Sequence, residues 1–289
     1  MIDSLIKSLY YFSFSLFGIR YSSNDIVGTI LSLLDMKTVM SNKFELYKYV
    51  ASVQQGIKAV ALSLLTLFFI INLIKLLTQE GVERVSWERI TLRACVFFLL
   101  KVFIDSADVS NGNSWIFAIT NTMQSIYELV KNTIALPNVQ GMDIADELIK
   151  IAEGAKFTDR LQYNVIYIIL AIPYMATIIM ILAQVTLRAV KLLIYLMFAP
   201  IPIVMAAEGE TYRGKAINYF MSLCSICFEA IVIYIGTFIY SVGMNGMALN
   251  TASGGGKIST VIGIMFLNGF FAALIGISSQ FSEKIFGRG

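Results

Sequence analysis

The strongest constraint on this chain is a series of long apolar segments that carry almost no charge. Residues 161–187 and 258–277 contain no charged side chain, and Glu229 is the only one within residues 216–243. A helix needs roughly 20 mostly apolar residues to cross a bilayer. Because backbone polar groups in lipid must be paired within the segment, we expect helices. The sequence therefore predicts an all-α, multi-pass membrane protein.

The composition agrees with this expectation. Of the 289 residues, 57% are hydrophobic and 14% are charged, and the mean hydropathy is +0.74. Soluble domains carry about 25% charged residues. The net charge of +3 does not suggest the concentrated basic face of a nucleic-acid-binding domain. An ordinary soluble domain is therefore excluded.

Two earlier segments complete the predicted set of membrane helices. Residues 59–74 are apolar, with a lysine at each end whose side chain can reach a membrane surface. Residues 90–104 hold Arg93 and Lys101, so this helix spans with snorkelling ends or packs against other helices. The predicted spans are residues 59–74, 90–104, 161–198, 216–243 and 258–277.

The number of spans depends on residues 184–191, QVTLRAVK. No glycine or proline lies between Gln184 and Phe198, so nothing signals a turn there. One helix from about Leu161 to Phe198 would be about 57 Å long, and the chain would have five spans. A turn within residues 184–191 would make residues 192–207 a sixth span. Lysine and arginine placement does not decide between the two counts.

Three prolines punctuate this long helix. Proline removes a backbone donor and clashes with the preceding turn. We expect a kink at Pro173, and an end or a further kink at Pro200 and Pro202. The apolar residues after Pro202 would then need a buried setting before Glu208 reaches water.

Composition divides the chain into four predicted regions. They are amphipathic N-terminal helices (1–56), the first two membrane helices (57–104), a polar helical insertion outside the membrane (105–160) and a C-terminal bundle of membrane helices (161–289). Apolar residues of the first region recur at helical spacing, and Asn24 or Asp25 could cap a second helix through Leu34. These apolar residues are Leu5, Leu9, Phe12 and Leu16.

The polar insertion is predicted to contain two helices. An apolar stripe lines one face of the first, and Met142-Asp143 opens the second with acidic residues in its first turn, which suits the helix dipole. Outside a membrane, such a stripe needs a surface to pack on. Its members are Trp115, Ile119, Met123, Ile126 and Val130.

No catalytic or metal-binding set is visible. The chain has no histidine, which removes the commonest general base and metal ligand. Cys224 and Cys227 have CxxC spacing, but Cys95 is the only other cysteine and no second pair completes a zinc site. No serine has the partners of a nucleophile–base set. We expect neither enzymatic activity nor a cofactor.

Glu229 lies near the middle of its span, where an ionisable group usually faces a bundle interior or a water-filled cavity. Either it lines an aqueous path or relays protons, or it is a structural carboxylate paired with Arg93, Lys101, Asn268 or a neighbouring subunit. A relay needs several titratable groups in series, so we favour a structural or lining role. The other intramembrane polar candidates are Gln184, Arg188, Lys191 and Asn268.

The last span carries two overlapping pairs of small residues. Gly269 pairs with Ala273, and Ala272 pairs with Gly276. Small residues let helix backbones approach closely, and Asn268 could add an interhelical hydrogen bond. The pattern predicts a packing face, within the chain or between subunits.

The order of these blocks resembles a known family. The stretch RAVKLLIYLMFAPIPIVMAAEGETYRGKAINYF follows an N-terminal amphipathic region, two spans and a polar insertion. Residues 40–245 resemble the TrbL-like membrane subunits of type IV secretion and conjugation systems, in a Gram-positive form. The central insertion is short and holds no recognisable separate domain.

The resemblance implies a non-enzymatic channel subunit of the cytoplasmic membrane. Such a subunit forms homo-oligomers, contacts other secretion subunits and ATPases, and meets the transferred DNA–protein substrate only transiently. The family's outside N-terminus and inside C-terminus fit five spans. The alternative is a secondary transporter or permease, which predicts interrupted helices in both halves. An interruption is visible in one half only, and a membrane-embedded enzyme is the least favoured reading.

Overall fold

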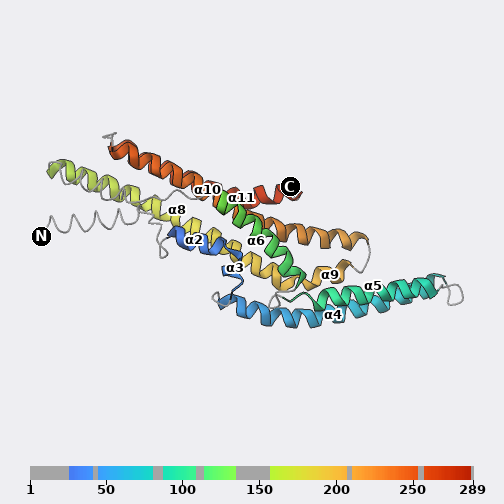
Figure 1. Cartoon of the computed structure of the whole chain (residues 1–289). Coiled ribbons are helices and arrows are strands. Elements are labelled where there is room, and N and C mark those ends of the chain that lie inside the picture. The colour runs from blue at the N-terminus through green and yellow to red at the C-terminus, as the bar shows by residue number, and fades with distance from the viewer. Residues whose placement is uncertain are drawn as a thin grey trace. The chain divides into compact units, whose positions relative to one another are not determined.

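The computed structural model describes residues 26–41, 45–80, 87–108, 114–134, 157–206, 210–252 and 257–287 (Figure 1). These residues form helices and contain no strand, which confirms the all-α prediction. The helices are α2 (Ile26–Leu34), α3 (Met36–Val39), α4 (Glu45–Glu80), α5 (Trp87–Asp105), α6 (Trp115–Thr133), α8 (Phe157–Phe198), α9 (Pro200–Ala206), α10 (Glu210–Ala252) and α11 (Lys257–Ile285).

Within the part of the chain that the structure describes, four segments are long and apolar enough to cross a membrane. They are Leu46–Thr78, Ile179–Phe198, Tyr212–Gly243 and Met265–Ile285. By length and composition they indicate a multi-pass membrane protein. The predicted span at residues 90–104 forms α5, which is helical but is not one of the four because charged side chains interrupt its apolar sequence.

Helix α8 is continuous through residues 184–191. It runs for 42 residues from Phe157 to Phe198, so no turn separates residues 161–187 from 192–207. The helix also continues through Pro173. The break falls at Ala199, and Pro200 opens the seven-residue helix α9. Pro202 lies in the first turn of α9, where a backbone N–H would have no helical acceptor in any case.

The structure describes only part of the predicted N-terminal region and of the predicted polar insertion. Leu5, Leu9, Phe12, Leu16, Asn24 and Asp25 lie outside the described residues, as do Met142 and Asp143. The second predicted N-terminal helix is present as α2 and ends at Leu34. Helix α4 begins at Glu45, so the predicted boundary between residues 56 and 57 falls inside a helix.

Helix α6 forms where the insertion was predicted to be helical. Ser114 caps it, since its Oγ accepts a hydrogen bond from the backbone N–H of Phe117 at 3.1 Å. The fully buried face differs by about one residue from the predicted stripe, whose members are partly exposed. The buried residues are Ile116, Thr120, Gln124 and Tyr127.

The chain forms two compact units, which we describe separately. Unit 1 comprises Met1–Asp35, Glu128–Leu187 and Glu229–Ser279, and unit 2 comprises Met36–Tyr127, Arg188–Phe228 and Gln280–Gly289. Helices α6, α8, α10 and α11 contribute residues to both.

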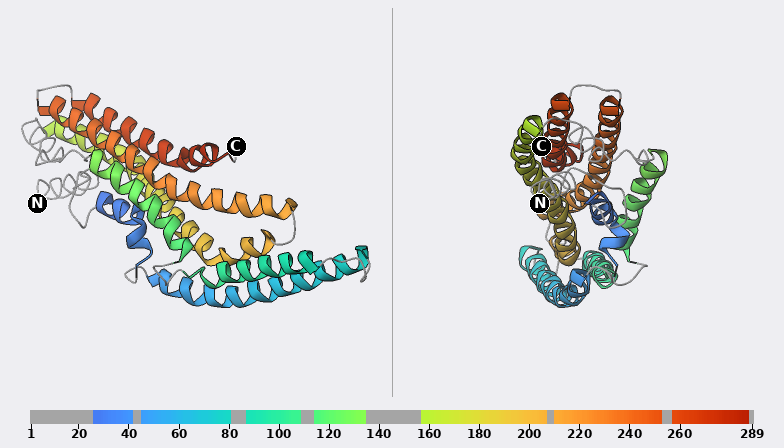
Figure 2. Two further views of the ribbon diagram at one scale, coloured as in Figure 1. Left: turned by 45° about the vertical axis from the view of Figure 1, so that its right-hand side comes forward. Right: turned by 90° about the vertical axis from the view of Figure 1, so that its left-hand side faces the viewer.

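Unit 2 is built on an antiparallel hairpin of α4 and α5, which run side by side in both views of Figure 2. Lys58 of α4 reaches the end of α5 at Asp105, and Arg93 near the start of α5 donates to the carbonyl of Asn72. Helix α9 packs against both helices. The resulting core consists of Ala61, Leu65, Ile104, Ile203 and Val204.

Unit 1 holds a close antiparallel contact between α10 and α11. A Cβ atom on Gly236 would lie 2.6 Å from Cδ2 of Leu274, and one on Gly243 would lie 2.8 Å from Cδ1 of Leu267. The ends of two leucine side chains therefore fill the space beside these glycines, and a larger residue at either position would have to displace them. Beside them, the rings of Tyr240 and Phe271 stack with centroids 4.8 Å apart.

Candidate functional site

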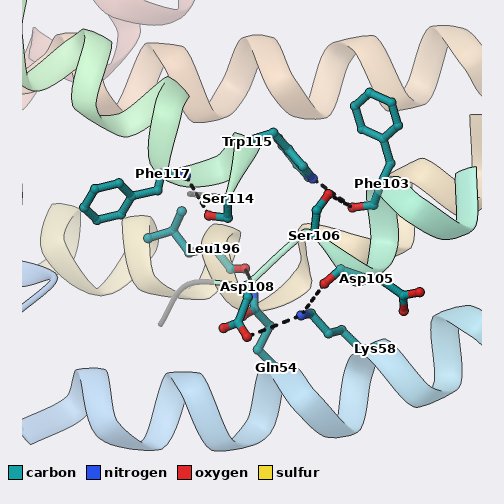
Figure 3. Close-up of polar contacts among 10 residues, drawn as sticks. All are labelled: Gln54, Lys58, Phe103, Asp105, Ser106, Asp108, Ser114, Trp115, Phe117 and Leu196. Carbon is teal, nitrogen blue, oxygen red and sulfur yellow. Dashed lines mark hydrogen bonds and ion pairs between the residues drawn. The ribbon is translucent and has the colours of Figure 1, made fainter. Parts of the chain in front are cut away.

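Polar groups gather where the α4–α5 hairpin meets the start of α6 (Figure 3). Lys58 Nζ donates to the carbonyl of Asp105 at 3.1 Å and pairs with Oδ2 of Asp108 at 3.7 Å. Trp115 Nε1 donates to the carbonyl of Phe103 at 2.9 Å. The last carbonyls of a helix have no partner within it. The side chains of this cluster therefore donate hydrogen bonds to backbone carbonyls at the C-terminus of α5.

A second polar contact in unit 2 lies at the break that proline makes between α8 and α9. In an unbroken helix the carbonyl of Leu196 would accept the N–H of residue 200, but Pro200 has none. Gln54 Nε2 donates to this carbonyl at 3.0 Å (Figure 3). The Gln54 side chain is 1% exposed. A buried amide on α4 thus replaces the donor that proline removes.

Arg188 lies at the centre of the apolar segment Ile179–Phe198 and is 1% exposed. Its Nε donates to the carbonyl of Ile226 in α10 at 3.0 Å. A buried charge is tolerated only where hydrogen bonds and charges compensate its desolvation. The guanidinium therefore ties α8 to α10 within unit 2. Lys191, the neighbouring candidate, is exposed.

Glu229 of α10 is 7% exposed. Ser278 of α11 donates a hydrogen bond from Oγ to Oε1 of Glu229 at 3.1 Å. Ser278 was not among the predicted partners. The burial and this contact fit a structural carboxylate that helps to join α10 and α11 in unit 1.

Asn268 bonds elsewhere on the same pair of helices. Its Oδ1 accepts a hydrogen bond from the hydroxyl of Tyr240 at 2.7 Å. Its buried Nδ2 has no acceptor among the described residues. The buried Oε1 of Gln184 likewise has no donor among them. Gln184 lies beside Gly276, where an added Cβ would be 3.6 Å from Nε2.

The small residues of α11 divide between two environments. Ala272 is 6% exposed, whereas Gly269 and Ala273 lie on the exposed side of the helix. Nothing lies within 4 Å of a Cβ added at Gly269. The close approach of α10 and α11 uses Gly236 and Gly243 instead, which we did not single out from the sequence. The available signal was their spacing, which matches that of Leu267 and Leu274.

The described residues contain no group of three or more metal-ligating side chains. All three cysteines are free: Cys95 is exposed, Cys224 is partly buried and Cys227 is buried. The arrangement supplies buried hydrogen bonds and two buried ionisable side chains, Arg188 and Glu229. It is suited to joining helices within each unit.

Comparison with known proteins identifies no relative: no family model, no curated protein and no solved structure matches the chain.

Proposed function

We propose that the chain is a structural channel subunit of a conjugative type IV secretion system. It works as a homo-oligomer in the cytoplasmic membrane, contacts other secretion subunits and ATPases, and helps a DNA–protein substrate to cross. The order of apolar blocks and the stretch from Arg188 to Phe220, which resembles TrbL-like subunits, motivate the proposal. It requires no catalytic step.

The observation that best supports this arrangement is the direction of the helices in unit 2. Gln54 contacts Leu196, and further along both segments Ala61 and Leu65 share a core with Ile203 and Val204. Residue numbers increase in the same direction along both segments. The end of α8 and α9 therefore run parallel to α4. Two spans are parallel only when an odd number of crossings separates them, and α5 supplies one. This supports five spans over four or six.

The surface of α5 supports its role as a span. Arg93 donates to the carbonyl of Asn72 on α4, so this charge is engaged on the packed side. The outward side is apolar and suits contact with lipid. Its exposed apolar residues include Leu92, Val96, Phe98, Leu99 and Val102.

The lengths of the helices support a place in a larger assembly. Helix α8 has 42 residues and α10 has 43. At about 1.5 Å per residue each exceeds roughly 60 Å, about twice the hydrocarbon thickness of a bilayer. Parts of both helices therefore project from the membrane, where they offer helical surfaces to other subunits.

The buried charges support an oligomer. Arg188 and Glu229 are 1% and 7% exposed, so neither faces an open path within one chain. Packed helices lie about 8–10 Å apart, which leaves no conduit for DNA between them. A path of sufficient width therefore needs several copies of the chain around it.

The particle mass in a mild detergent tests the proposal. We expect a defined multiple of the 32.1 kDa chain after the detergent mass is subtracted. A strict monomer would overturn the channel ring. Deletion of the gene should abolish conjugative transfer, and expression of the wild-type chain should restore it.

The alternative of a secondary transporter has one specific observation in its favour. Helix α8 breaks at Ala199, and the fully buried Arg188 lies in the segment before the break. Interrupted helices with buried polar groups form binding sites in many transporters. A monomer whose thermal stability rises with one small solute would favour this function over the channel subunit.

A further inference from the structure

An open groove lies along the α4–α5 hairpin of unit 2. Its volume is about 310 Å³, and it is lined by Leu62, Ser63, Thr66, Phe97 and Lys101. The two helices are antiparallel, so Lys101 lies level with Leu62 and Phe97 lies level with Thr66. The groove is therefore charged at one end and apolar at the other.

The charged end lies close to the polar cluster that ends α5. Lys101 is one helical turn before Asp105, whose carbonyl binds Lys58. One turn is about 5.4 Å along the helix. A lysine side chain is long enough to bring its ammonium back to the level of that cluster. Trp115 belongs to the cluster, and tryptophan is enriched at membrane surfaces.

Lys101 has a charge that the described residues do not balance. Lys58 pairs with Asp108, whereas Lys101 is exposed and has no ion-pair or hydrogen-bond partner in the described ranges. An ammonium at a membrane surface is attracted to the anionic headgroups of lipids. The position therefore suits a negative group that the described residues do not supply.

The walls of the groove indicate what carries this negative group. Leu62 and Phe97 offer apolar surface. The hydroxyls of Ser63 and Thr66 donate to the carbonyls one turn back in their own helix, both at 2.9 Å, and so need no donor or acceptor from a ligand. The wall below the lysine therefore suits a hydrocarbon chain.

We propose that this groove binds an anionic phospholipid. The phosphate lies against the ammonium of Lys101, and the first part of an acyl chain lies over Leu62 and Phe97. On the same two helices, Val60, Phe98 and Val102 are exposed and are available for contact with neighbouring lipid. The inference requires α4 and α5 to lie in a membrane, but it does not depend on the chain forming a secretion channel.

Native mass spectrometry of the full-length protein tests the site. The protein is taken from mixed micelles that hold equal amounts of phosphatidylglycerol and phosphatidylcholine. We expect retained lipid to favour phosphatidylglycerol about fivefold, in line with one lysine at an anionic surface. Lys101→Gln should lose this preference. Lys101→Arg should keep it, since guanidinium also binds phosphate.

Lys131→Gln is the matched control, because Lys131 is exposed on α6 and its loss changes the net charge equally. It should leave the preference intact. An unchanged preference in Lys101→Gln would overturn the lipid site, and so would the absence of a preference in the wild type. The absence of a preference would indicate that Lys101 binds an acidic partner protein instead. Displacement by millimolar inorganic phosphate would overturn it in favour of a soluble anion. A monomer that prefers phosphatidylglycerol would refute the channel ring alone.

Discussion

Gln54 donates a hydrogen bond to the carbonyl of Leu196 over 3.0 Å, and this carbonyl is the one that Pro200 deprives of its helical donor. The break between α8 and α9 is thus completed by a side chain from α4. A long apolar helix can end inside a packed environment because a distant glutamine satisfies the freed backbone group.

Replacement of Gln54 by leucine should destabilise unit 2. The substitution keeps a similar side-chain volume but removes the amide donor to the carbonyl of Leu196. We therefore expect the free energy of unfolding to fall by about 1 kcal/mol. Pro200→Ala restores a backbone N–H to the helix. In that background Gln54→Leu should cost less.

Unfolding in detergent provides the double-mutant cycle for this pair. Gln55→Leu is the control, since Gln55 is adjacent and exposed. Strictly additive effects of Gln54→Leu and Pro200→Ala would contradict the assigned role of the amide.

Gly236→Val should destabilise the contact between α10 and α11. A Cβ at this position comes within 2.6 Å of the terminal methyl Cδ2 of Leu274, so valine has to displace the end of that side chain. Overpacking costs about 1–3 kcal/mol; because the end of a leucine can shift, we expect about 1 kcal/mol, and Leu274→Ala should recover part of the loss. Chemical unfolding of the purified variants measures both effects.

Gly269→Val is the matched control for the glycine experiment. It introduces the same side chain into α11 at an exposed position with nothing within 4 Å. It should leave unfolding unchanged, and a lower oligomer mass would assign the Gly269–Ala273 face to contacts between subunits. Equal destabilisation by both valines would contradict the glycine contact at Gly236.

The sequence predicts where the helices lie better than it predicts which residues of different helices contact one another. Charge-free runs and Pro200 favour one long helix and its end near Phe198, because both act within one helix; they leave open the turn at residues 184–191 that the continuous α8 excludes. The role of Gln54 depends on a carbonyl that tertiary packing brings beside it. Likewise, α10 and α11 both carry small residues, and only the facing leucines select Gly236 and Gly243 over Gly269. Side-chain spacing alone does not contain that information.

Cys95 reports directly on whether α5 crosses the membrane. Its side chain is exposed on the protein near the middle of α5. In a Cys224→Ala/Cys227→Ala background, a membrane-impermeant maleimide should not label it in intact membranes, because thiolate formation and reagent access both need water. Denaturation in detergent should make it reactive.

A cysteine at Trp87 is the positive control for the α5 experiment, placed in a chain that lacks Cys95. Trp87 is 81% exposed at the first residue of the helix and should be labelled in opened membranes. Rapid labelling of Cys95 before denaturation would place α5 in water and reduce the span count to four.

Glu229→Gln should impair assembly or transfer more than expression. The amide keeps an oxygen that accepts the hydrogen bond from Ser278, so folding should be nearly unchanged, while the buried charge is lost. Ser278→Ala is the complementary variant, because it keeps the charge and removes the bond, at a cost of about 0.6 kcal/mol. Expression, oligomer mass and transfer frequency are compared. A glutamine variant that assembles and transfers like the wild type would show that the carboxylate has no pairing or lining role.

With five spans and the N-terminus outside, as we propose, the loop after α9 would lie inside the cell. Cysteines at Glu208 and at Ser253, each in a cysteine-free chain, test this because α10 lies between the two positions. We expect Glu208→Cys to react in inverted vesicles and Ser253→Cys to react on intact cells. Glu208→Cys labelled from outside would rule out the orientation. Labelling of both from the same side would show that α10 does not cross the membrane and would contradict the five-span topology.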